Sequence, residues 1–159
     1  NNSTVINYFQ NSEKKNPKIF ARLERIKVVD SKKKDPNKDY HFDTFHNTFK
    51  SWLFIKDVSI NDGPFYFIPS SHKFSMKRFL MEWKMSIQYS LKNIETSFRT
   101  DKSKDKNLDE KAVKFAVNKN TFVMANTHAL HRRGDADDNT TRDSIQFWTR
   151  ENPFKIIFN

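Results

Sequence analysis

Short hydrophobic segments dominate the chain and predict β-strands. The clearest is residues 49–58, where a continuous apolar run from Trp52 to Ile55 indicates burial on both faces of a sheet. Similar but looser patterns predict four more strands, at residues 19–29, 112–117, 121–126 and 142–149. An Asn-Asp-Gly-Pro turn at residues 61–64 separates residues 49–58 from another apolar segment, residues 65–69. These two strands are therefore expected to form a hairpin.

A helical period replaces this pattern at residues 75–98. Phe79, Trp83, Ile87 and Leu91 are four residues apart, and Ser75 can cap the first turn. The pattern predicts a helix inserted between strands. Because apolar stripes at helical spacing usually face a core, Trp83 is expected to be buried.

The order of these elements predicts the fold class. Polar stretches at residues 31–39, 100–111 and 128–141 predict the longer loops. Several short strands with one helical insertion favour an all-β core, a mainly antiparallel sandwich or barrel of the jelly-roll or cupin-like kind. A chain of 159 residues fits one domain, so we expect residues 1–159 to form a single domain.

Composition narrows the possible chemistry. There is no Cys, which excludes disulfides and thiolate metal sites, so a metal would be bound through His and carboxylates. The net charge is +10, but Lys is spread along the chain and most aromatic residues lie in apolar strands, which argues against a nucleic-acid partner. No apolar run approaches the ~20 residues of a membrane span. Residues 1–10 lack the pattern of a signal peptide, so a cytoplasmic location is expected.

Two histidine clusters suggest a metal site. His41 and Asp43 are two residues apart, so in an extended segment both side chains point to the same side while Phe42 points away. Either His128 or His131, from the second cluster, would complete a set of two His and one carboxylate. Such a set occupies one face of an octahedron around Fe(II) and leaves three positions open, enough for a chelating 2-oxo acid and O₂. Lys50 lies nearby in sequence; it could face the cavity and touch an acidic group, but a solvated side chain is expected.

A possible anion anchor follows the second cluster. Arg142 and Ser144 share one face of the last predicted strand, and Gln146 continues that face. The planar guanidinium of Arg142 matches a carboxylate in two parallel hydrogen bonds, and Ser144 adds a hydroxyl donor. Together they would hold the far carboxylate of 2-oxoglutarate while its oxo-acid end chelates iron.

Several of these motifs together resemble the phytanoyl-CoA dioxygenase family. They are the run His-Phe-Asp-Thr-Phe-His at residues 41–46, the strand beginning at Phe49, the turn at residues 62–64, Ile-Pro-Ser-Ser-His-Lys at residues 68–73, and His-Arg-Arg-Gly at residues 131–134 followed by Arg142. Their order and spacing match over about residues 40–154.

The resemblance implies a double-stranded β-helix that binds Fe(II) and converts 2-oxoglutarate to succinate and CO₂. By position it implies His41, Asp43 and His131 as iron ligands, and Arg142 as the 2-oxoglutarate anchor. The expected activity is that of a dioxygenase which hydroxylates a small organic substrate with O₂.

The sequence departs from the family's pattern in two places. The family usually has Gly where Ser70 stands, so the turn there is expected to differ, because Gly adopts positive φ at low cost. Only forty residues precede His41, fewer than is usual in the family, and the sequence leaves open whether an N-terminal segment of the domain is missing. This second departure bears on the substrate pocket more than on the metal.

One alternative keeps the barrel but not the reaction. A cupin-like isomerase or binding protein would hold zinc or iron with a similar set of ligands. Such a protein would have no need of Arg142 and Ser144, and this difference favours the oxygenase.

Overall fold

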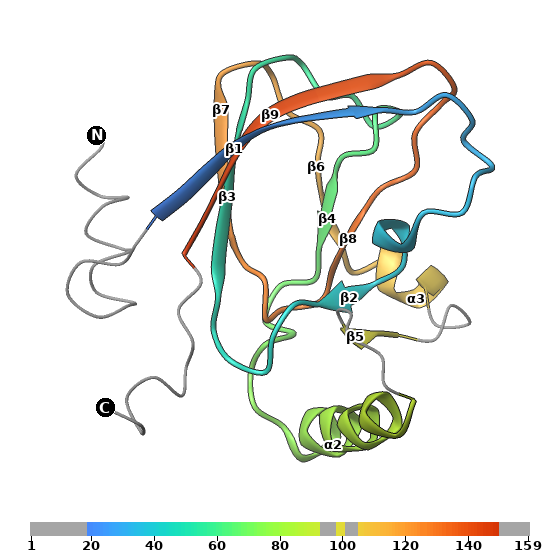
Figure 1. The fold of residues 1–159 in the computed structure, drawn as a ribbon, viewed down its shortest axis with the longest axis vertical. Helices are drawn as coiled ribbons and strands as arrows, with labels where there is room; N and C mark the ends of the chain where they lie inside the picture. The colour runs from blue at the N-terminus through green and yellow to red at the C-terminus, as the bar shows by residue number, and fades with distance from the viewer. Residues whose placement is uncertain (1–18, 93–97, 101–104, 150–159) are drawn as a thin grey trace.

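The computed structural model describes residues 19–92, 98–100 and 105–149, and the strands of this part of the chain form two antiparallel sheets (Figure 1). The four-stranded sheet has the order β1 (Ile19–Lys27), β9 (Thr141–Thr149), β3 (Phe49–Phe54) and β7 (Thr121–Asn126). The five-stranded sheet has the order β5 (Phe98–Arg99), β2 (His41–Phe42), β8 (His131–Arg133), β4 (Phe65–Phe67) and β6 (Val113–Phe115). The described helices are η1 (Pro36–Lys38), α2 (Met76–Leu91) and α3 (Asp105–Asp109).

The two sheets pack face to face through an apolar core. Trp52 and Phe54 on β3 and Val123 on β7 meet Phe65 on β4, and the rings of Trp52 and Phe65 are 4.7 Å apart. A second apolar cluster joins the outer side of β2 to α2 through Tyr40, Phe42, Ile68, Met85 and Leu130. The predicted all-β core with an inserted helix is confirmed.

The predicted hairpin is wrong. β3 pairs with β7 and β9 in the four-stranded sheet, whereas β4 pairs with β6 and β8 in the five-stranded sheet. The turn at residues 61–64, with Gly63 at φ 68°, carries the chain from one sheet to the other. A turn sequence reports that the chain changes direction, but it does not identify the strand with which each arm pairs.

The expectation that the run at residues 49–58 is buried on both faces is also wrong. Trp52 and Phe54 are buried between the sheets, but Leu53 is only partly covered and Ile55 is 40% exposed. The strand ends at Phe54, four residues before the predicted end. The structure describes nothing that covers the outer face of this sheet, so the side chains that alternate with Trp52 remain near solvent.

The inserted helix is confirmed, but the face that was expected to be buried is exposed. Ser75 caps α2 by accepting a hydrogen bond from the Arg78 N–H. The helix ends at Leu91 and Phe98 belongs to β5, so the predicted end at residue 98 is wrong; residues 93–97 lie outside the described residues. Trp83 is 59% exposed and not in the core, because the helix buries Arg78 and Met85 instead.

The predicted polar loop at residues 128–141 contains strand β8, so that prediction is wrong at His131–Arg133. The two arginines of β8 form ion pairs, Arg132 with Asp109 and Arg133 with Asp35. Because these residues are charged, the sequence of β8 lacks the alternation of apolar residues by which a strand is predicted. Ser70 has φ 61°, so this turn adopts the left-handed conformation that Gly favours in spite of the Ser. No helix among the described residues is long and apolar enough to cross a membrane.

Candidate metal centre

Strands β2 and β8 bring two histidines side by side, with their rings tilted by 53°. His41 is the register partner of His131, and their ring centroids are 4.4 Å apart. The alternation of the strand turns Phe42 into the apolar cluster under α2, while His41 and Asp43 line a cavity on the other side. The Asp43 N–H donates to the Thr127 carbonyl, which ties this end of the segment to the loop before β8.

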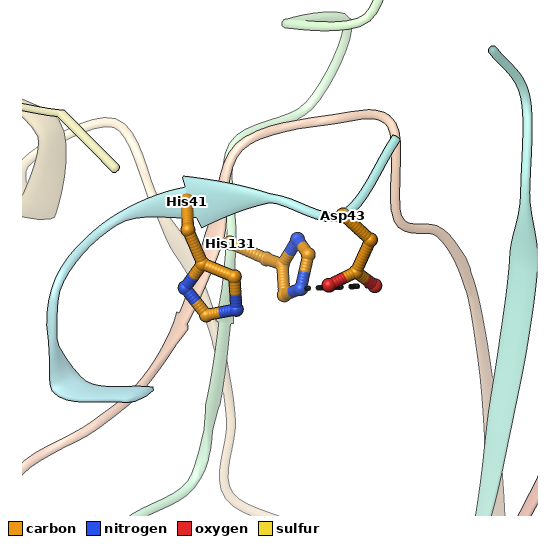
Figure 2. A group of neighbouring side chains, drawn as sticks. All are labelled: His41, Asp43 and His131. Carbon is orange, nitrogen blue, oxygen red and sulfur yellow. Dashed lines mark ion pairs between the residues drawn. The ribbon is translucent and has the colours of Figure 1, made fainter. Parts of the chain in front are cut away.

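The ligand atoms of His41, Asp43 and His131 all lie within 4.8 Å of one another. Figure 2 shows the three side chains pointing into the same space, with Asp43 Oδ2 3.8 Å from His131 Nε2. Two nitrogen donors and one oxygen donor are therefore close enough to bind a single metal ion, and no other group of this kind occurs in the described residues.

Backbone carbonyls fix the orientation and tautomer of both imidazoles. His41 Nδ1 lies 2.8 Å from the Asp39 carbonyl, and His131 Nδ1 lies 2.9 Å from the Ala129 carbonyl. A carbonyl only accepts, so each Nδ1 carries a proton and each Nε2 keeps its lone pair for a metal. Burial lowers the pKa of both histidines, that of His131 to about 4, so both rings are neutral near pH 7.

Lys50 on β3 contacts the same site, so the expectation that it is solvated is wrong. Its Nζ lies 2.7 Å from Asp43 Oδ2, and its side chain is 28% exposed. Burial raises the pKa of Asp43, but the nearby His131 and Lys50 outweigh it, so the pKa lies below its ordinary value. The carboxylate is therefore ionised near pH 7, and Lys50 places a cation against it.

Arg142, Ser144 and Gln146 all occupy the buried face of β9, as their alternation predicts. An Arg142 N–H donates to the Gly63 carbonyl, but Arg142 Nε has no hydrogen-bond partner in the described part of the chain. Burial, and then the charge of Arg133, lower the pKa of Arg142 to about 10. Ser144 Oγ is likewise buried without a partner there. A buried cation with a free donor is a suitable partner for an anion.

A cavity of about 280 Å³ connects these groups. It lies between the sheets, and its lining includes the three candidate ligands together with Lys50, Arg142 and Gln146. Ser144 is not part of the lining. Apolar side chains of Trp52, Phe54 and Phe65 form part of the wall, and Arg22, Glu24, Ile26, Asn37, Arg132 and Arg133 complete it.

His128 and Arg132 have other partners. His128 Nε2 lies 3.2 Å from Glu82 on α2, away from the three candidate ligands. Arg132 is buried and forms two hydrogen bonds with the Asp109 carboxylate on α3, at 3.0 and 2.9 Å. The Tyr40 hydroxyl donates to the same carboxylate. The charge pattern of the sequence indicates none of these contacts, because the partners are distant along the chain.

Comparison with known proteins yields matches among solved structures alone. No family model matches the chain, and no curated protein matches it. Similar structures include AviO1 from Streptomyces viridochromogenes Tue57, at 11% identity and a TM-score of 0.46, covering 83% of this chain and 51% of that one. HygX from Streptomyces hygroscopicus, solved with nickel and 2-oxoglutarate bound, has 14% identity and a TM-score of 0.45, covering 80% and 55%.

A third match, the nickel complex of the non-heme monooxygenase ThoJ, has 12% identity and a TM-score of 0.47, covering 81% of this chain and 42% of that one. The chain thus spans about half the length of these structures. Similarity at this level does not bear on the activity of this chain.

Proposed function

We propose that this chain is an Fe(II)- and 2-oxoglutarate-dependent oxygenase with a double-stranded β-helix fold, hydroxylating a small organic substrate. One observation carries the proposal. A single cavity contains two neutral imidazoles and one carboxylate within bonding reach of one ion, and also a buried arginine with an unpaired donor.

The donor set fits iron. His41, Asp43 and His131 would hold Fe(II) through two nitrogens and one oxygen, and both rings are already in the tautomer that metal binding requires. When bound, Fe(II) would supply the O₂ chemistry in which 2-oxoglutarate is oxidised to succinate and CO₂ and one oxygen atom enters the substrate.

The remaining residues would orient the cosubstrate and exclude water. Arg142 would donate to the far carboxylate of 2-oxoglutarate from the cavity wall and so satisfy its buried, unpaired Nε donor. Ser144, behind the lining on the same face of β9, would assist by supporting this end of the site. Trp52, Phe54 and Phe65 would keep that part of the cavity dry. A metal-binding barrel that does not use 2-oxoglutarate would need no anion partner for the unpaired Arg142 Nε.

Anaerobic titration of the full chain tests the proposal. Fe(II) should bind at about one per chain, and 2-oxoglutarate should then produce a metal-to-ligand absorption band. His131→Ala should lose most Fe(II) binding, while the matched control His128→Ala should keep it, because His128 faces Glu82.

Arg142→Ala should keep Fe(II) but weaken 2-oxoglutarate binding by at least ~10-fold. Hydrogen bonds to charged groups contribute about 1.5–3 kcal/mol, and ~1.4 kcal/mol corresponds to tenfold. Unchanged 2-oxoglutarate affinity in this variant would favour the cupin-like alternative. Fe(II) binding that is equal in wild type and His131→Ala would reject the metal site itself.

A further inference from the structure

The exposed face of α2 is apolar. Phe79, Trp83, Ile87 and Leu91 recur every four residues and form one stripe along the helix, and each of them is exposed. Leu91 is 82% exposed. Phe74 and Met76 extend the same surface at the start of the helix, and both are exposed as well.

The stripe is directed away from the domain. Arg78 and Met85, which are seven residues apart, form the buried face of α2 on the opposite side of the helix from Trp83. Arg78 anchors this face by donating to the carbonyls of Ser71 and His128, and its guanidinium lies 4.2 Å from the Phe42 ring centre. In Figure 1, α2 lies outside both sheets, at the end of the molecule away from β1 and β9.

Positive charge accompanies the apolar stripe. Lys77 and Lys84 are exposed on α2, and Lys73 and Lys92 are exposed just before and after it. Glu82 is the single carboxylate of α2, and it faces inward, where it bonds to Arg78 and lies near His128. The exposed surface of the helix therefore presents aromatic and aliphatic side chains, lysines and the small or neutral polar side chains of Ser86, Gln88 and Ser90, and no carboxylate.

We propose that α2 binds the surface of an anionic lipid membrane, lying in the plane of the interface. The aromatic and aliphatic side chains of the stripe would enter the boundary between headgroups and acyl chains, and the lysines would extend to the phosphates. A helix with a Trp- and Leu-bearing apolar face and a basic polar side is the type that binds such surfaces. This binding is separate from the proposed metal chemistry.

Charge argues for lipid over a second copy of the chain. Two copies packed through this face would bring the lysines of both helices together, while each Glu82 remains turned inward in its own domain. Anionic headgroups neutralise the same lysines. The surface also fits lipid in shape, because a single projecting helix offers a stripe and no groove.

Vesicle flotation with the full chain tests the proposal. Vesicles of phosphatidylcholine with about one third phosphatidylserine should bind the protein, and vesicles of phosphatidylcholine alone should bind it at least ~10-fold more weakly. Salt should weaken the binding, because the lysine contribution is screened. In a variant with Trp52 and Trp148 replaced by Phe, binding should also shift the fluorescence of Trp83 to shorter wavelength, and lipids brominated near the headgroup should quench it.

Two double variants and two controls separate the contribution of the apolar stripe to vesicle binding from that of the lysines. Phe79→Ser with Trp83→Ser, and Lys77→Glu with Lys84→Glu, should each reduce binding at least ~10-fold. Leu23→Ser, at an exposed apolar residue of β1, should bind like wild type, as should Lys27→Glu with Lys119→Glu, which makes the same charge change away from α2. Circular dichroism and melting curves would confirm that each variant folds.

Three results would overturn the proposal. The first is an absence of wild-type binding to the phosphatidylserine vesicles. The second is equal binding by wild type and by the folded Phe79→Ser, Trp83→Ser variant. The third is a dimer in solution that this variant abolishes while vesicle binding is absent, which would assign the stripe to a second copy of the chain.

Discussion

Lys50 introduces a positive charge into the place where the proposed metal would be bound. Its ammonium group contacts Asp43 Oδ2 at 2.7 Å, and both groups lie in the cavity between the sheets. A divalent ion bound to Asp43 would neutralise the negative charge of the carboxylate and repel the ammonium group of Lys50. The ion pair therefore competes with metal binding at Asp43 and opposes the proposed ligand set.

Replacing Lys50 should consequently strengthen metal binding. We expect Lys50→Met to bind Co(II), a spectroscopic substitute for Fe(II), about three- to tenfold more tightly, because a pair of this exposure contributes on the order of 1 kcal/mol. Titration followed by the visible absorption of Co(II) measures the change. Lys56→Met is the matched control, since Lys56 pairs with Asp143 on the outer face of the four-stranded sheet and should leave the affinity unchanged. Weaker binding by Lys50→Met would show that Lys50 supports the site.

Among the elements, edge strand β1 depends on a charged cluster as well as on its pairing with β9. The Asp143 carboxylate of β9 accepts from Arg25 of β1 at 2.8 and 2.9 Å, and Lys56 lies 3.0 Å from it. The hydrogen bond from Arg25, and next that from Lys56, lower the pKa of Asp143 to about 2. The cluster thus links the edge strand to the rest of the sheet through a carboxylate that stays ionised in mild acid.

This lowered pKa predicts how stability changes with pH. A carboxylate whose pKa is lower in the folded state stabilises the fold above its unfolded pKa, near 4, and the stabilisation disappears as the pH falls toward 2. Urea unfolding at pH 5, 4, 3 and 2 should therefore show wild type more stable than Asp143→Asn at pH 5, with the difference shrinking toward pH 2. A difference that stays constant over this range would show that Asp143 acts through packing and not through its charge.

At the scale of the whole molecule, the proposed metal would connect distant parts of the chain. His41 lies on β2 and Asp43 directly follows it, whereas His131 lies on β8, about ninety residues later. An ion held by all three would bind only the folded state, because the unfolded chain does not bring them together. Metal binding and global stability are thereby coupled.

Thermal unfolding should report this coupling. At a free metal concentration of about 100 times Kd, binding to the folded state adds ~2.7 kcal/mol, which for a domain of this size corresponds to a rise in Tm of about 5–10 °C. Differential scanning calorimetry with and without Co(II) measures the shift. Asp43→Asn should melt at the same temperature in both conditions. An equal rise in this variant would indicate metal binding elsewhere on the chain.

The sequence by itself determined features that depend on neighbours along the chain. Alternation correctly predicted that His41 and Asp43 face one side while Phe42 faces the other, and that Arg142, Ser144 and Gln146 share the buried face of β9. The strand at Thr121–Asn126 and the Ser75 cap were also readable from local patterns. These features follow from backbone geometry over two to four residues, which any window of sequence contains.

The tertiary structure alone decided which surfaces meet. The pairing of β3 with β7 and β9, the ion pair of Lys50 with Asp43, and the outward direction of the α2 stripe all depend on residues far away in sequence. Periodicity reports that a helix has an apolar face, but a buried arginine bonded to two carbonyls can hold the opposite face against the domain. Strand pairing and helix orientation depend on many such contacts between residues distant in sequence, and a local sequence pattern contains no information about them.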